Sequence, residues 1–167
     1  PVLLFDDDHY YMGSVLAEHL VARGVEVIFV TPAADVAAWT HNTLEQHRIQ
    51  RRLLELNVTL VTSHTLVKCA PQGVVAGCVY TERQRFIAAA SLLLVTSREP
   101  EQALYEALIT TPEQLRASGV GTLTLVGDCV APGTIAAAVY SGHRIAREFD
   151  MPADSLVVRR EIPTIEV

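Results

Sequence analysis

Three aspartates and two tyrosines stand between a short apolar run and the first predicted helix. Residues 6–11 follow the apolar run 2–5 and lead into Gly13. A glycine-rich loop at such a place binds phosphate, because its backbone approaches the oxygens closely and the helix N-terminus is positive. In the spacing G-x-G-x-x-G counted back from Gly13, Asp8 and Tyr10 replace the first two glycines. A carboxylate repels phosphate and a tyrosine ring fills its space, so the loop is predicted not to bind a dinucleotide.

A second departure lies after the next apolar run, residues 25–30. Nicotinamide-binding domains place an acidic residue there for the ribose hydroxyls, or an arginine for a 2′-phosphate. Here the chain has Thr31 and Pro32. We therefore expect the nicotinamide site to be lost. The alternative left open is a working NAD(P)H-binding module.

The acidic run has other interpretations. Paired aspartates after a first strand can hold Mg²⁺ in a phosphoacceptor domain, but such a domain needs a further carboxylate after its third strand. That place, residues 61–64, contains none. We interpret Asp6, Asp7 and Asp8 as a solvated loop whose carboxylates favour the positive end of the following helix. No metal site is predicted.

A second group of polar residues follows apolar residues 123–126. Gly127, Asp128 and Cys129 stand there, immediately before the last predicted helix. An aspartate at such a turn can accept hydrogen bonds from ligand hydroxyls or cap the helix. The six histidines show no ligand spacing, and no Ser-His-Asp or Cys-His arrangement is found. No catalytic residue is predicted.

Alternating apolar runs predict the elements that position these residues. Gly24 and Asn57 are typical residues just after a helix end, and Asn42 with Glu45 predicts a capping box at a helix start. Trp39, with Tyr10 and Tyr11, is assigned to the core in preference to a docking surface. The predicted strands are 2–5, 25–30, 58–61, 65–70, 74–81, 85–88, 91–96, 122–126 and 155–159, and the predicted helices are 13–24, 42–56, 101–109 and 132–149, with a linker or short helix at 111–118.

This order predicts an α/β fold with a Rossmann-like parallel sheet and an antiparallel β meander. It is the arrangement of the NAD(P) domain in flavoproteins of the disulfide reductase type. A strand and helix around Gly127 would extend it.

The motifs resemble those of one group of flavoproteins. The segment from Gly127 to Cys129 is similar to the second FAD-binding motif of proteins with two dinucleotide domains. Residues 6–13, 38–45 and 48–53 resemble the C-terminal region of the trimethylamine dehydrogenase family. That family includes dimethylamine and histamine dehydrogenases and NADH:flavin oxidoreductases related to dienoyl-CoA reductase.

The resemblance implies that residues 1–110 are an NAD(P)-binding-like domain with a degenerate glycine loop. Residues 111–167 would be the returning segment of an FAD- or ADP-binding-like domain. Gly127, Asp128, Cys129 and Gly13 are the expected nucleotide contacts, with ADP or FAD on the Asp128 side. No cofactor is expected to bind tightly to this chain alone. FMN and a 4Fe-4S cluster would belong to a TIM barrel elsewhere in the parent enzyme.

The composition of the chain argues against a nucleic-acid-binding or membrane-spanning protein. The chain has 167 residues, a formal net charge of −6 and 50% hydrophobic residues, so it can bury a core and is unsuited to nucleic acid. No apolar run is long enough to span a membrane. Three widely spaced cysteines suggest buried reduced thiols in a cytoplasmic protein. A start at Pro1 suggests a segment of a longer protein. Expected partners are the rest of the parent chain and, as an alternative role, an electron-transferring protein docked on this region.

Overall fold

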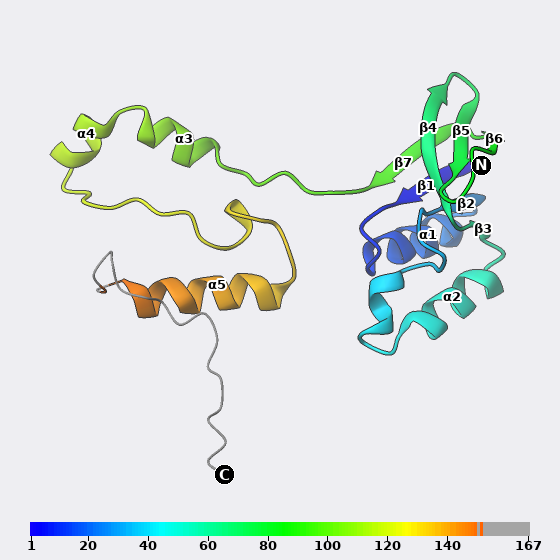
Figure 1. The fold of residues 1–167 in the computed structure, drawn as a ribbon, viewed down its shortest axis with the longest axis horizontal. Coiled ribbons are helices and arrows are strands. Elements are labelled where there is room, and N and C mark those ends of the chain that lie inside the picture. The colour runs from blue at the N-terminus through cyan, green and yellow to red at the C-terminus, as the bar shows by residue number, and fades with distance from the viewer. Residues whose placement is uncertain (150, 152–167) are drawn as a thin grey trace, which may run out of the picture. The chain divides into compact units, whose positions relative to one another are not determined.

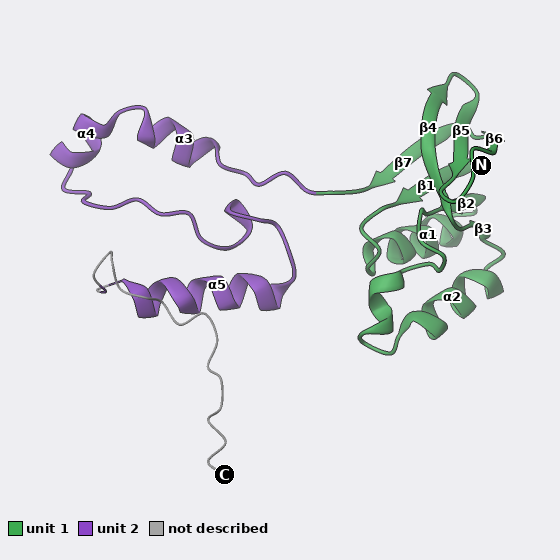
Figure 2. Ribbon diagram, in the orientation of Figure 1, with its two compact units in different colours: residues 1–97 green, residues 98–167 purple. Residues whose placement is uncertain are grey.

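The computed structural model describes residues 1–149 and 151, which form two compact units (Figure 2). Unit 1 comprises Pro1–Ser97 and unit 2 comprises Arg98–Val167. The sequence-based boundary was drawn after residue 110, whereas the compact division falls after Ser97. Helix α3 therefore belongs to unit 2. Each unit is described by itself.

A four-stranded parallel sheet is the centre of unit 1 (Figure 1). Its strand order is β3-β2-β1-β7, and every neighbouring pair is parallel. Leu4 lies opposite Phe29 on one side and Leu93 on the other. The strands are β1 (Val2–Asp6), β2 (Val27–Val30), β3 (Thr59–Val61) and β7 (Ser91–Val95). They confirm the predicted strands within two residues at each end.

Two helices cover one face of this sheet. They are α1 (Met12–Ala22) and α2 (Gln46–Glu55). Ala17 and Leu53 pack with Leu4 and Phe29 in a core cluster from which water is excluded. As predicted, left-handed residues follow both helix ends, with φ of 77° at Gly24 and 58° at Asn57.

An antiparallel sheet covers the opposite face. Its strands β4 (His64–Ala70), β5 (Gly73–Cys78) and β6 (Gln84–Ala88) pair in that order. Val74 packs with Leu3 and Phe5 of β1 in a second core cluster. Because alternate residues of β1 point to opposite faces, the strand supplies both clusters. The predicted α/β fold with a meander is confirmed.

Unit 2 contains α3 (Ala103–Ile109), α4 (Pro112–Ala117), a short 3-10 turn η2 (Gly127–Cys129) and α5 (Ile135–Glu148). None of its described residues is buried. The predicted strand 122–126 is wrong. A strand needs a hydrogen-bonded neighbouring strand, and none of the described residues of unit 2 forms a strand. The predicted strand 155–159 lies outside the described residues. No helix in the described part of the chain is long and apolar enough to cross a membrane.

Two further predictions are wrong. Helix α2 begins at Gln46 after Glu45, not at Asn42, because Leu44 is left-handed with φ of 62° and interrupts the helical path. The three thiols are free but not buried, since Cys69 is exposed and the other two are partly exposed.

Candidate functional site

The loops that follow β1 and β2 meet at the carboxyl edge of the parallel sheet. The amide of Trp39 donates to the carbonyl oxygen of His9 over 2.8 Å and joins the two loops. His9 and Ala37 are left-handed, with φ of 59° and 51°, a backbone state that non-glycine residues seldom adopt outside functional or tightly constrained sites. Ligands of open α/β sheets bind at this edge.

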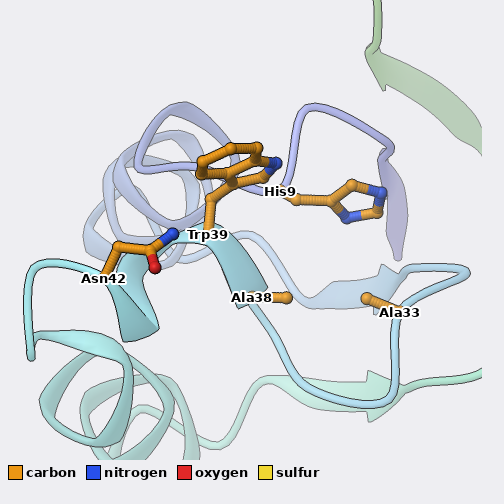
Figure 3. Close-up of a pocket in the computed structure, with 5 residues that line it drawn as sticks. All are labelled: His9, Ala33, Ala38, Trp39 and Asn42. Atoms are coloured by element: carbon orange, nitrogen blue, oxygen red, sulfur yellow. The ribbon is translucent and has the colours of Figure 1, made fainter.

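A shallow pocket lies between these loops (Figure 3). Its volume is about 290 Å³, and its lining residues are His9, Ala33, Ala38, Trp39 and Asn42. The His9 ring is held in place by two neighbours. Its Nε2 lies 3.1 Å from an Asp7 oxygen, and its Nδ1 lies 3.5 Å from the Thr31 hydroxyl. Figure 3 shows the Trp39 and His9 rings coming from different loops, with two alanine methyl groups below them in this view.

Trp39 is exposed, and its assignment to the core was wrong. The residue is 63% accessible, and Tyr11 in the neighbouring loop is 49% accessible. Ala37 and Thr40 take the interior positions of this turn, where the Thr40 hydroxyl donates to the Ala37 carbonyl over 2.6 Å. The indole is therefore turned outward, beside the pocket.

Asp6 is the least expected residue of the site. Its carboxyl is fully buried, and neither oxygen accepts a hydrogen bond of normal geometry. Burial raises the pKa of Asp6 to about 6, outweighing the nearby His9 ring and the amides of Asp8 and His9, which favour the ionised form. The solvated-loop interpretation is therefore wrong for Asp6. For Asp7 the solvated-loop interpretation holds in part, because the side chain is 51% exposed but also lies 3.1 Å from the His9 ring.

Asp6 lies against the first turn of α1. A Cβ atom added to Gly13 would stand 2.9 Å from the Asp6 Cγ, so glycine is needed there to admit the carboxyl group. The helix has no acidic residue in its own first turn. The chain thus supplies its own carboxyl group beside the helix N-terminus, where phosphate approaches in dinucleotide-binding domains.

The other predicted contacts lie together in unit 2, in the turn before α5. The amide of Gly127, whose φ is 70°, donates to the Ser141 hydroxyl over 3.0 Å. The amide of Gly133 donates to the exposed Asp128 carboxylate over 3.3 Å. The Cys129 thiol donates to the Val126 carbonyl oxygen over 2.9 Å.

This turn is tied to the start of α5. The Thr134 side chain caps the helix by accepting a hydrogen bond from the Ala137 amide. Asp128 therefore sits on a braced turn and is still open to solvent, so it can accept hydrogen bonds from hydroxyl groups. The structure brings Gly127, Asp128 and Cys129 together, whereas Gly13 packs against Asp6 in unit 1. Sequence reasoning missed Asp6 as a distinct group, although its place at the end of a buried strand was a signal.

Comparisons with known proteins agree with this architecture. Residues 1–83 match the family described as the OYE-like second alpha/beta domain. Histamine dehydrogenase from Rhizobium sp. 4-9 is 40% identical, with a TM-score of 0.91 over 99% of this chain and 26% of that chain. The 6-hydroxypseudooxynicotine amine oxidase from Pseudomonas geniculata N1 is 32% identical, with a TM-score of 0.82 over 90% and 22%. Dimethylamine dehydrogenase from Hyphomicrobium sp. (strain x) is 27% identical over 89% of this chain and 23% of its own length. The chain thus spans about a quarter of the length of these relatives.

Proposed function

We propose that this chain, which is similar to histamine and dimethylamine dehydrogenases, is the nucleotide-domain-like part of a flavin-dependent amine dehydrogenase of the trimethylamine and histamine dehydrogenase family. Unit 1 acts as a scaffold that has kept the fold of an NAD(P) domain without its nicotinamide site. Oxidation of the amine would take place elsewhere in the enzyme, in a barrel where FMN would supply the redox chemistry beside a 4Fe-4S cluster. Unit 1 supplies a rigid three-layer body and no reacting group.

The buried Asp6 carboxyl is the observation that supports the loss of the nicotinamide site. It occupies the side of Gly13 that faces the end of β1. A dinucleotide phosphate at this helix terminus would meet a group that is negatively charged above pH 6, and would have to displace a side chain with no exposed surface. Thr31 is buried at the end of β2 and offers no carboxylate to ribose hydroxyls.

We expect no binding of reduced nicotinamide nucleotides to the 167-residue chain. The measurement is the thermal midpoint of unit 1, followed by the fluorescence of Trp39, with NADH, NADPH or ADP added at submillimolar concentration. A ligand that binds only the folded state raises this midpoint, so the absence of a shift is the expected result. A rise of several degrees with NADH would contradict the scaffold assignment and support an NAD(P)H-binding module.

We propose that unit 2 is one layer of an FAD- or ADP-binding domain. Its described residues have no buried side chain, and α5 exposes Ile135, Val139 and Tyr140 by more than half. Apolar groups in such number are covered by other parts of a protein when it is fully folded. Asp128 would accept hydrogen bonds from hydroxyls of the ribityl or ribose group, and Gly127 would let the backbone approach the ligand. The nucleotide, when bound, supplies a structural anchor as ADP or an electron carrier as FAD.

The Asp128→Ala substitution tests this role in the full-length enzyme. We expect the purified variant to contain several-fold less ADP or FAD, because loss of a hydrogen bond that a hydroxyl donates to a charged group costs about 1.5–3 kcal/mol. The content of nucleotide released by denaturation is the readout, and FMN content serves as an internal reference. Glu113→Gln, an exposed position on α4, is the matched control. Equal nucleotide content in all three proteins would remove Asp128 from the site.

A further inference from the structure

The loops around the pocket of unit 1 have a one-sided charge. Residues 7–11 and 31–45 contain no lysine or arginine. Their acidic residues are Asp7, Asp8, Asp35 and Glu45. These two loops therefore carry a net negative charge whenever their imidazole groups are neutral, and such a charge repels phosphate and attracts cations. In dinucleotide domains the loop after the first strand binds an anion, so the loops here have the opposite preference.

The pocket itself offers a surface that suits a cation. The Trp39 indole forms one wall and is 63% accessible. The face of an indole ring attracts ammonium and guanidinium groups more strongly than any other side-chain ring does. Ala33 and Ala38 are small lining residues, and Asn42 adds an amide oxygen that can accept a hydrogen bond from the ligand. At about 290 Å³ the pocket has room for one such group and not for a dinucleotide.

The pocket is also pre-formed. The backbone hydrogen bond between Trp39 and His9 joins two lining residues, and within the loop that carries Trp39 an Asp35 oxygen lies 3.1 Å from Nε2 of His41. The Val36 amide donates to the side-chain oxygen of Gln50 on α2 over 3.3 Å. A site held in place by such bonds loses little conformational freedom when a ligand arrives.

We propose that this pocket binds the cationic group of a small organic amine, an alkylammonium or guanidinium group, against the Trp39 indole. The carboxylates of Asp7 and Asp35, placed through their His9 and His41 partners, set the sign of the charge that the pocket accepts. The proposal concerns unit 1 alone and does not depend on a nucleotide in unit 2.

Trp39 is the only tryptophan of the chain, so its fluorescence reports directly on this pocket. The 167-residue chain is titrated at a pH where imidazole is ordinarily neutral. The probes are choline and its uncharged isostere 3,3-dimethylbutanol, at constant ionic strength. We expect a saturable fluorescence change with choline and binding of the isostere weaker by roughly two- to fivefold, the value of an exposed cation–π contact. Equal binding of the two probes, or no saturable change with choline, would overturn the proposal.

Variants separate a specific site from general attraction. Asp7→Asn and Asp35→Asn should each weaken choline binding, and together should reduce the preference over the isostere to the part that the Trp39 indole supplies. Glu82→Gln, an exposed acid on the turn between β5 and β6, removes the same charge and should leave choline binding unchanged. A loss in the Glu82 variant equal to that in the Asp35 variant would show diffuse electrostatics and no site.

Two further probes distinguish the source of the cation. An arginine amide and a short arginine-containing peptide present the same guanidinium group. Equal affinity for both supports a free small molecule as the occupant. Much tighter binding of the peptide would contradict that occupant, because the remaining contacts would then come from a protein chain.

Discussion

Replacing Asp6 with asparagine is expected to abolish a pH-dependent loss of stability in unit 1. In the folded state the pKa of Asp6 is about 6, against 3.8 for the ordinary side chain. Between these values the folded protein holds a proton that the unfolded chain has lost, so the free energy of unfolding falls as the pH rises. The fall is about 3 kcal/mol and is complete above about pH 6. An asparagine side chain does not titrate in this range, so the variant lacks this fall.

The measurement is denaturant unfolding of the wild-type chain and the variant from about pH 4 to 8, followed by Trp39 fluorescence. The difference between the two free energies should grow in favour of the variant by about 3 kcal/mol as the pH rises. Any constant cost of burying the amide cancels in this comparison. Asp7→Asn is the matched control, because the Asp7 side chain is half exposed and its ion pair with His9 is worth about 1 kcal/mol at most. If the difference in the free energy of unfolding between the wild type and the Asp6 variant did not change with pH, the raised pKa of the buried Asp6 carboxyl would be refuted.

Adding a single methyl group at Gly13 is expected to destabilise unit 1 by roughly 1–3 kcal/mol. An alanine in an unobstructed helix is normally favoured over glycine by about 1 kcal/mol, so the sign itself is informative. Here the new Cβ would stand 2.9 Å from the Asp6 Cγ. Asp6 has no exposed surface through which to move away. The readout is the midpoint of unfolding, again from Trp39.

A double-mutant cycle identifies the cause. In the Asp6→Ala background the Gly13→Ala change meets no carboxyl group and should be neutral or stabilising. The coupling between the two positions should then exceed about 1 kcal/mol, as is usual for residues in direct contact. An equal loss in both backgrounds would mean that the helix start, and not the Asp6 contact, requires glycine.

The fold could be predicted largely from the sequence because its strands are buried on both faces. Residues 25–30 are almost continuously apolar, which is typical of a covered parallel strand, and Gly24 marks the preceding helix end. The strand expected at 122–126 rests on apolar residues that alternate with threonine. Such a pattern indicates only that a segment is able to pack in a sheet. The prediction fails because the described part of unit 2 contains no strand with which this segment could pair.

The site was less predictable, because exposure of single side chains depends on the tertiary structure. A lone tryptophan is usually a core residue, yet Ala37 and Thr40 fill the interior beside Trp39. Three consecutive aspartates look alike in sequence. The place of Asp6 directly after an apolar run was a weak signal, and in the structure the pairing of β1 with β7, where Asp6 lies opposite Val95, distinguishes Asp6 as the one that is buried.

The pairing of β1 with β7 also means that the segment matched by the family model is shorter than the segment that forms the sheet. The match to the OYE-like second alpha/beta domain covers residues 1–83 and stops before β6 and β7 begin. A polypeptide ended there would leave one edge of β1 unpaired, with Asp6 beside the gap, and would lack the outer strand of the meander. During synthesis, unit 1 can therefore complete its sheet only after residue 95 has left the ribosome. Within unit 1, β1 is therefore synthesised well before β7, with which it pairs, and any expression boundary at the end of this unit belongs after Ser97.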